Sequence, residues 1–142
     1  MNKNFFYLAV LAVVLIVAAL LAGCAKRSYK DGVYAAKSGA DDSGAWGEVT
    51  VTIADGEVAD CLFVTRQKDG TIKAEDYGKV NGVISNQDFY NKAQLAVRAM
   101  DQYARTFRET GDLAKVDVVT GATIAFNQFN EAVTAALEQA VK

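Results

Sequence analysis

The hydrophobic positions of the chain divide it into two parts. Of the first 24 residues 20 are apolar, against 53 of the remaining 118. A short start that carries one positive charge, Lys3, precedes an uncharged run from Phe5 to Cys24. A basic start followed by an apolar run is typical of a secretory signal segment, and the run would also be long enough to span a bilayer. The pattern therefore places the first part at a membrane and leaves signal and permanent helix open.

Alternating residues and turn signals predict strands at the start of the second part. Apolar residues alternate with threonines over 49–53, the period of two that is typical of a half-buried strand. Asp55-Gly56 is a turn signal, so we expect a hairpin whose second strand covers 58–65. Another strand is expected over 32–36. These segments predict a small antiparallel sheet.

Apolar residues at helical spacing follow, after a charged and glycine-containing stretch over 67–86 that we expect to be irregular. Ser85 or Asn86 provides a cap for a helix that ends near Gly111. The apolar stripe of this helix consists of Phe89, Ala93, Ala96, Val97, Met100, Ala104 and Phe107. A last helix, from about 124 to 141, is expected to bury Phe129, Val133, Ala136, Leu137 and Ala140. The predicted class is α+β, a small twisted antiparallel sheet packed against helices.

The composition excludes several kinds of catalytic and metal-binding site. The chain has no His, which excludes Ser-His-Asp and Cys-His catalysis, His-ligated haem and His-bearing zinc sites. Two cysteines are too few for a four-cysteine metal site. With 15 basic and 17 acidic residues the net charge is -2, which gives no electrostatic footprint for nucleic acid. Cys61 lies in a strand-like apolar run, so we expect a buried, inert thiol without a disulfide partner in the chain.

The end of the first apolar run carries a more specific signal. Leu21-Ala22-Gly23-Cys24 resembles the lipobox of bacterial lipoproteins, in which the Cys receives a lipid and becomes the mature N-terminus. The resemblance implies a signal peptide over 1–23, a lipid-anchored tether over 24–30 and a domain over 31–142. Cys24 would then hold the domain at the extracytoplasmic face of the cell membrane. An uncleaved helix with an incidental Cys is the alternative.

The segment before the last helix combines hydroxyl groups with small residues. A strand-like run ends in Thr120 and Thr123, which flank Gly121-Ala122 at a helix start. Helix starts leave backbone N–H groups unpaired and carry partial positive charge, and small residues let an anion approach the backbone. The segment therefore suits a bound phosphate. An ordinary N-cap, with the side chain of Thr120 or Thr123 accepting a backbone N–H, is the alternative.

Asp117-Val118-Val119-Thr120-Gly121-Ala122-Thr123 resembles the flavinylation motif of the FMN-binding domain family, which includes subunits of the Rnf and sodium-pumping quinone reductase complexes and many extracytoplasmic lipoproteins. In that family a Ser or Thr at the last motif position carries FMN through a phosphoester, made by a flavin transferase that consumes FAD. The resemblance implies attachment at Thr123, with Asp117, Thr120, Gly121 and Ala122 as the other cofactor-binding positions. Thr120 stands where Ser is more frequent. The similarity extends through 31–34, the hairpin and the closing helix.

The resemblance implies a function as well as a fold. It implies a membrane-anchored flavoprotein whose covalent FMN transfers electrons from a membrane reductase to an extracytoplasmic acceptor, with no catalytic residues of its own and no nucleic-acid partner. Four side chains are candidates to cover the flavin ring: Trp46, Tyr77, Met100 and Phe126. One alternative is a surface lipoprotein without flavin that binds a ligand or protein partner. A minor alternative is that the signal peptide is a pheromone source, through its last eight residues, 16–23.

Overall fold

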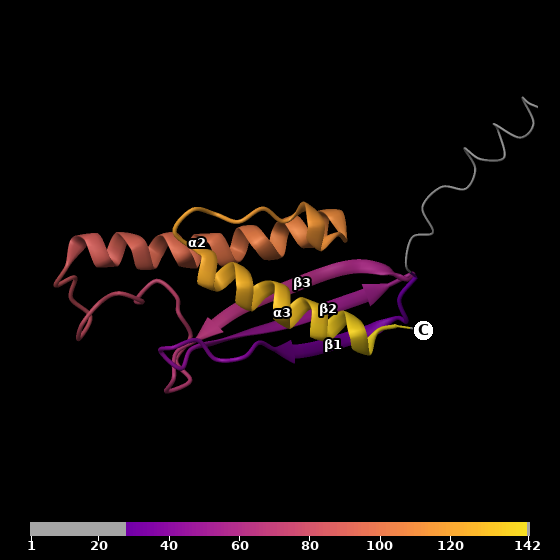
Figure 1. Cartoon of the computed structure of the whole chain (residues 1–142), viewed down its shortest axis with the longest axis horizontal. Helices are drawn as coiled ribbons and strands as arrows, with labels where there is room; N and C mark the ends of the chain where they lie inside the picture. The colour runs from indigo at the N-terminus through magenta and orange to yellow at the C-terminus, as the bar shows by residue number, and fades with distance from the viewer. Residues whose placement is uncertain (1–27, 142) are drawn as a thin grey trace, which may run out of the picture.

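A computed structural model of the chain describes residues 28–141. Three strands, β1 (Gly32–Lys37), β2 (Trp46–Ala54) and β3 (Glu57–Arg66), form an antiparallel sheet in the order β1-β2-β3. The helices are α2 (Gln87–Thr110), the short 3-10 helix η1 (Leu113–Lys115) and α3 (Thr123–Gln139). In Figure 1, α3 crosses the sheet and α2 runs beside it. The predicted α+β class is confirmed, whereas the predicted signal segment and Cys24 lie outside the described residues.

The hairpin forms where the Asp-Gly turn predicts it. Asp55 and Gly56 have φ values of 54° and 77°, as the two central residues of a type I′ turn require. Asp31 fixes this turn from the neighbouring segment, because its carboxylate accepts a 2.8 Å hydrogen bond from the Gly56 N–H. At the end away from the turn, β2 begins three residues before the predicted limit and β3 ends one residue after it, so that Trp46 pairs with Arg66.

Only one face of the sheet is buried. Val49 and Val51 of β2 lie opposite Phe63 and Cys61 of β3, and all four are at most 5% exposed. Both helices pack on this face, with α3 against β1 and β2 and α2 against β3. The other face is open to solvent, as the 62% exposure of Leu62 shows. Burial, together with the charge of Asp60, raises the pKa of the Cys61 thiol to about 12, so Cys61 is the buried thiol that the sequence predicts.

The long helix α2 has the predicted ends. The Asn86 side chain accepts a hydrogen bond from the Phe89 N–H, and Gly111, in the left-handed region, donates its N–H to the Phe107 carbonyl. The predicted stripe is wrong at Phe89, which is 53% exposed. The start of α2 extends past the sheet in Figure 1, and the Phe89 ring packs edge-on against Tyr77 of the preceding loop, with 6.5 Å between the ring centroids. Tyr103, absent from the predicted stripe, is fully buried.

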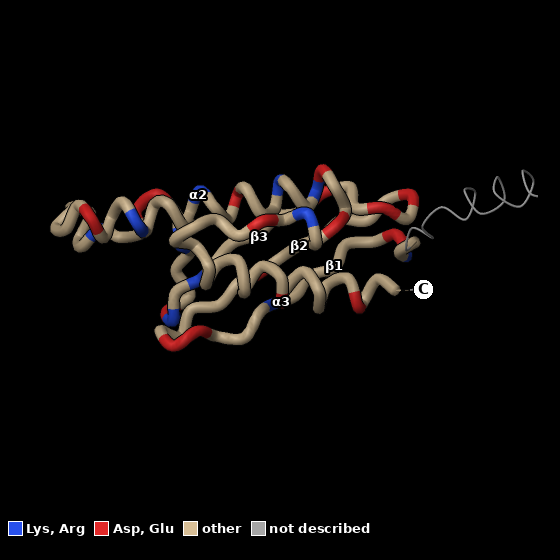
Figure 2. Tube along the Cα trace, turned by 45° about the horizontal axis from the view of Figure 1, so that its top comes forward, with Lys and Arg blue, Asp and Glu red and all other residues tan. Residues whose placement is uncertain are grey.

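The closing helix α3 buries Phe129, Val133 and Ala136 as expected, while Leu137 is only partly buried. Phe129 lies at the centre of the core, with its ring centroid 5.0 Å from that of Phe63 and 6.1 Å from that of Phe107. Figure 2 shows charged residues spread along α2 and few on α3. Among residues 28–141, no helix combines the length and apolar character that crossing a bilayer needs.

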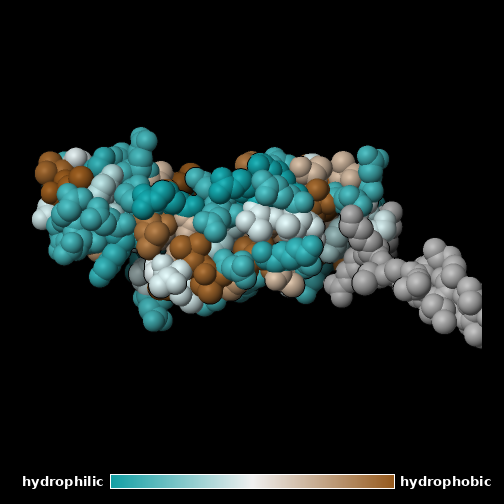
Figure 3. Space-filling model, turned by 90° about the horizontal axis from the view of Figure 1, so that it is seen from above, coloured by the Kyte–Doolittle hydropathy of each residue, from teal (hydrophilic) through white to brown (hydrophobic). Residues whose placement is uncertain are grey.

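Exposed apolar side chains gather at one end of the molecule. Figure 3 shows them at the end opposite the grey trace, over the start of α2 and the loop before it, where Val80, Val83, Ile84 and Phe89 are exposed. The described chain begins at the other end, where the Lys30 N–H bonds the Ala140 carbonyl at 2.8 Å.

Candidate functional site

The segment before α3 forms a tight turn held from inside the core. The Ala122 N–H donates to the Val119 carbonyl at 2.9 Å, and Gly121 has a φ of 88°. A positive φ at the third residue is the mark of a type II turn and explains the glycine there. The buried Tyr103 hydroxyl accepts from the Val119 N–H at 3.0 Å and donates to the Ala122 carbonyl at 3.3 Å. Tyr103 thus fixes the position of the turn and of the helix start after it.

The first turn of α3 has no side-chain cap. Its N-cap is Ala122, which makes no side-chain hydrogen bond, and no acidic residue lies in the first turn. The alternative in which Thr120 or Thr123 caps the helix is therefore wrong. Thr123 is the first helical residue and is exposed. Because neither a cap nor a carboxylate neutralises this helix end, its positive partial charge remains available to an anion beside Thr123.

A pocket of about 350 Å³ opens beside this helix start, and we call it the α3 pocket. Its volume lies in the range of about 300 to 1,000 Å³ that small-molecule sites occupy. One part of its wall is apolar and comes mainly from Ala96, Val97 and Met100 of α2 and Ala122 and Ala125. The remaining wall is largely polar and consists of Asp41, Ser43, Thr65, Lys73, Tyr77, Gly121, Thr123, Ile124 and Gln128.

Two buried polar atoms of this wall have no hydrogen-bond partner within the described part of the chain. They are Thr65 Oγ1 and Gln128 Oε1, in residues that are 1% and 5% exposed. Gln128 is held in place because its Nε2 donates to the Ala45 carbonyl at 2.9 Å. A buried polar group without a partner costs about 1–3 kcal/mol. Both residues line the α3 pocket, so a ligand with polar groups on its edge could supply the missing partners.

Charge in the α3 pocket comes from Lys73 and Asp41. Burial lowers the pKa of the Lys73 ammonium, an effect that the Asp41 carboxylate partly offsets. Burial alone would raise the pKa of Asp41, but hydrogen bonds from Ser43 and from the Ala45 N–H hold it below its usual value. Burial, with the charge of Asp41, raises the pKa of the Tyr77 hydroxyl. The pocket thus contains one partly desolvated cation facing a fixed carboxylate.

The predicted site residues fall into two groups. Gly121, Ala122 and Thr123 line the α3 pocket, whereas Asp117 and Thr120 are exposed and lie outside its lining. Among the predicted ring-covering side chains, Tyr77 and Met100 line the pocket. Trp46 instead donates to Glu48 at 3.0 Å, and Phe126 packs edge-on against Tyr103 at 5.5 Å.

Sequence reasoning missed Thr65, Lys73 and Gln128. Thr65 lies at the end of β3 and Lys73 lies in a loop. Polar residues are common in both places, so neither residue gave a signal. Gln128 carried a signal, since it falls among the inward-facing positions of α3 yet is polar. A polar residue in an apolar stripe is an indication that something polar lies opposite it.

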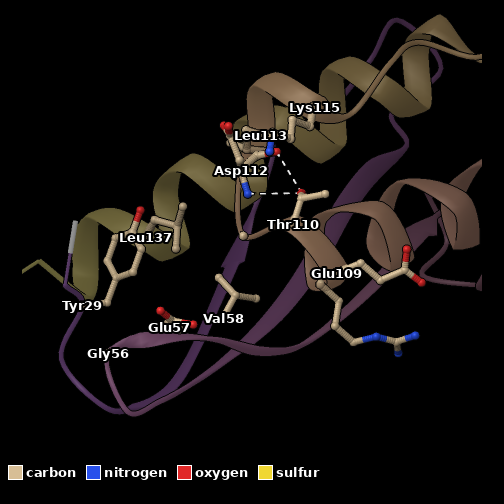
Figure 4. Close-up of a pocket in the computed structure, with 12 residues that line it drawn as sticks. Tyr29, Gly56, Glu57, Val58, Glu109, Thr110, Asp112, Leu113, Lys115 and Leu137 are labelled. Atoms are coloured by element: carbon tan, nitrogen blue, oxygen red, sulfur yellow. Dashed lines mark hydrogen bonds between the residues drawn. The ribbon is translucent and has the colours of Figure 1, made fainter. Parts of the chain in front are cut away.

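A larger pocket, of about 530 Å³, lies at the other end of the domain, and we call it the Tyr29 pocket. Figure 4 shows Tyr29 and Leu137 on one side and the segment from Glu109 to Lys115 on the other. The Thr110 hydroxyl, on this segment, bonds both the N–H and the carbonyl of Asp112 at 3.3 Å. Neither of the two unpartnered buried atoms lines this pocket.

The fold and the α3 pocket define a small α+β domain with a ligand site at an uncapped helix start. No group of His, Cys, Asp or Glu side chains within residues 28–141 is arranged to hold a metal ion. The sequence profile of the FMN-binding domain matches residues 44–138, and the chain belongs to this family. It is therefore a flavin-binding protein.

Comparison with solved structures shows the fold independently. The crystal structure of the CPE2226 protein from Clostridium perfringens superimposes with a TM-score of 0.62 at 22% identity, over 79% of this chain and 88% of that one. No curated protein was found to be significantly similar to the chain.

The residues of the α3 pocket fit FMN. The uncapped start of α3 provides positive partial charge for a phosphate. The apolar wall from α2 suits a ring face, and Thr65 and Gln128 offer hydrogen bonds to a polar ring edge. When bound, FMN supplies the redox chemistry, and the protein supplies binding, orientation and electrostatics.

Proposed function

We propose that the protein is a lipid-anchored extracytoplasmic flavoprotein that carries FMN on Thr123 and transfers electrons. The observation that carries this proposal is the place of Thr123. It lies on an uncapped helix start, at the mouth of the pocket whose buried polar atoms lack partners. A hydroxyl there can hold a phosphate against the helix end while the rest of FMN reaches the pocket.

Attachment requires the Thr123 hydroxyl to react within a flavin transferase. The Thr123 oxygen attacks the flavin-bearing phosphorus of FAD, and the new P–O bond forms as the pyrophosphate bond breaks. AMP leaves, and the hydroxyl proton is released. The resulting phosphodiester keeps one negative charge, which an exposed helix start stabilises by about 0.3–1 kcal/mol. The exposure of Thr123 supports access by the transferase.

The proposed lipid anchor and the proposed flavin lie at opposite ends of the domain. Three residues lie between Cys24 and Ser28, so an extended chain over these four residue-to-residue steps spans at most about 14 Å. The chain then meets the end of α3, where Lys30 bonds Ala140. Thr123 is at the start of this helix, whose 17 residues measure about 25 Å. This arrangement would hold the flavin away from the membrane surface, which supports electron exchange with extracytoplasmic proteins.

The proposed role is that of a carrier and not of an enzyme. The described pocket wall contains Lys73 and Asp41 but no His, and its Ser43 hydroxyl donates to the Asp41 carboxylate at 2.6 Å within the turn over 41–45. We propose a membrane reductase as electron donor and an extracytoplasmic protein as acceptor. A covalent bond has a clear advantage in this setting, because it turns weak binding into permanent occupancy.

Co-expression of the full chain with a flavin transferase tests the attachment. We expect a fluorescent flavin band on a denaturing gel, lost in Thr123→Ala and kept in Thr120→Ala, the matched exposed threonine outside the pocket. A fluorescent band in Thr123→Ala would refute the attachment site. Intact mass from native membranes tests lipid and FMN together. A mass equal to the lipidated polypeptide alone would identify a surface lipoprotein without flavin.

A further inference from the structure

The polar wall of the α3 pocket offers a specific set of hydrogen bonds. Gln128 uses its Nε2 on the Ala45 carbonyl, so its unpartnered Oε1 can only accept. The unpartnered Thr65 hydroxyl can both accept and donate. A ligand that satisfies both atoms therefore presents an N–H to Gln128 Oε1 and either a donor or an acceptor to Thr65 Oγ1. The pyrimidine edge of a flavin ring has this pattern, with one N–H between two carbonyl oxygens.

Lys73 is placed beside these groups by the backbone. Its N–H donates to the Thr65 carbonyl at 2.8 Å, which aligns the segment with the end of β3. The Lys73 side chain lines the same pocket as Thr65 and Gln128. Its ammonium lies 5.1 Å from the centre of the Tyr77 ring and is partly buried. The one other charged residue of the pocket lining is Asp41, whose Oδ1 accepts hydrogen bonds from the N–H groups of Ser43 and Ala45.

We propose that Thr65 and Gln128 bind the polar edge of the flavin ring and that Lys73 sets its reduction potential. Lys73 stabilises the one negative charge that remains on the ring after uptake of two electrons from a reductant and one proton from solvent. The lysine stays protonated throughout. A positive charge near the ring makes reduction more favourable, so it raises the midpoint potential. Lys73 is thus a tuning residue and Thr65 and Gln128 are binding residues.

Riboflavin tests the binding residues without a covalent bond, because it has the ring and lacks the phosphate. In the full chain bearing Thr123→Ala, we expect saturable quenching of riboflavin fluorescence. Adding Thr65→Val or Gln128→Leu should weaken binding about tenfold, the effect of losing one buried hydrogen bond. Thr65→Ser, which keeps the hydroxyl, should restore it. Absence of saturable binding, or equal affinity in all of these proteins, overturns the assignment.

Measurement of the midpoint reduction potential tests the role of Lys73. This test rests on the proposed attachment of FMN at Thr123. In the flavinylated full chain, equilibrium titration against reference dyes should give a lower midpoint potential for Lys73→Met than for the unchanged protein. Lys73→Arg should keep the higher value. Lys115→Met, at the Tyr29 pocket, is the matched control and should leave the potential unchanged. Equal potentials in Lys73→Met and Lys115→Met overturn the tuning role.

These experiments distinguish failure of the proposed covalent attachment from failure of the proposed ring contacts. Absence of the fluorescent band from the unchanged chain co-expressed with the transferase would refute covalent attachment, while riboflavin binding would still test the pocket. Thermal unfolding of each variant shows that the protein is folded. A folded Gln128→Leu protein with unchanged riboflavin affinity overturns the inference even when FMN is attached to Thr123.

Discussion

A comparison of the Tyr29 pocket with the α3 pocket shows that volume does not mark a ligand site. The Tyr29 pocket measures about 530 Å³ and the α3 pocket about 350 Å³. In the larger one, the Thr110 hydroxyl is hydrogen-bonded to the Thr106 carbonyl at 2.8 Å. In the smaller one, buried atoms of Thr65 and Gln128 have no partner. The two pockets thus differ in whether their buried polar atoms have hydrogen-bond partners. Buried polar atoms without partners indicate the kind of ligand that a site binds.

The largest loss of stability is expected at one of two glycines, one of which lines each pocket. Gly121 has a φ of 88°, and an added Cβ would lie 3.0 Å from a Leu95 methyl. Gly111 has a φ of 63°, and its Cβ would meet nothing closer than 4.0 Å. We expect Gly121→Ala to cost about 2 kcal/mol and Gly111→Ala about 1 kcal/mol. Urea unfolding measures both, and a larger cost at Gly111 would contradict the view that the turn before α3 is the more constrained.

A pair of tyrosines gives the next contrast. Tyr103→Phe removes the hydroxyl that accepts from the Val119 N–H, so we expect a loss of about 1.5 kcal/mol. Tyr29→Phe, in the other pocket, should change stability by less than about 0.5 kcal/mol. Tyr103→Phe should also reduce the flavinylated fraction on the denaturing gel, because the position of Thr123 depends on this turn. Full flavinylation in Tyr103→Phe would show that the transferase does not need the preformed turn.

Two threonines should respond with opposite signs. Thr65→Val removes a buried hydroxyl without a partner, and we expect the flavin-free protein to gain about 1 kcal/mol. Thr110→Val removes a hydroxyl that donates to the Thr106 carbonyl, and we expect a loss of about 1 kcal/mol. Thermal unfolding distinguishes them. Destabilisation by both substitutions would mean that Thr65 has no unmet hydrogen bond in the flavin-free protein.

The smallest effect is expected on the open face of the sheet, away from both pockets. Hydrogen bonds from Arg66, Trp46 and Lys37 lower the pKa of Glu48 from 4.5 to about 2. Because the folded-state pKa is the lower one, this stabilisation is present above pH 4.5 and is lost as the pH falls toward 2. We expect Glu48→Gln to cost less than about 1 kcal/mol at pH 7.

The pH dependence provides the control for this ion-paired cluster. The difference in melting temperature between Glu48→Gln and the unchanged protein should shrink from pH 5 to about pH 2, over the range set by the Glu48 pKa. A difference that stays constant over this range would contradict the role of the Glu48 charge. Riboflavin affinity should be unaffected, because Glu48 lines neither pocket.

Local chemistry made much of the fold predictable. Asp55-Gly56 specified the hairpin turn, and Asn86 and Gly111 specified the ends of α2, because each acts on its own neighbours in the chain. Phe89 was misplaced for the opposite reason. Its helical spacing is correct, but burial depends on whether the sheet extends beneath it, which spacing does not encode.

The candidate site likewise has a part that local motifs predict and a part that depends on packing. The family, the helix start at Thr123 and the prediction of a lipid anchor at Cys24 follow from contiguous motifs, whereas the turn over 119–122 was not predicted. Only the tertiary structure brought Thr65, Lys73 and Gln128 to one wall. The physical reason is that an unmet hydrogen bond is a property of packed surroundings, and no residue reveals it alone.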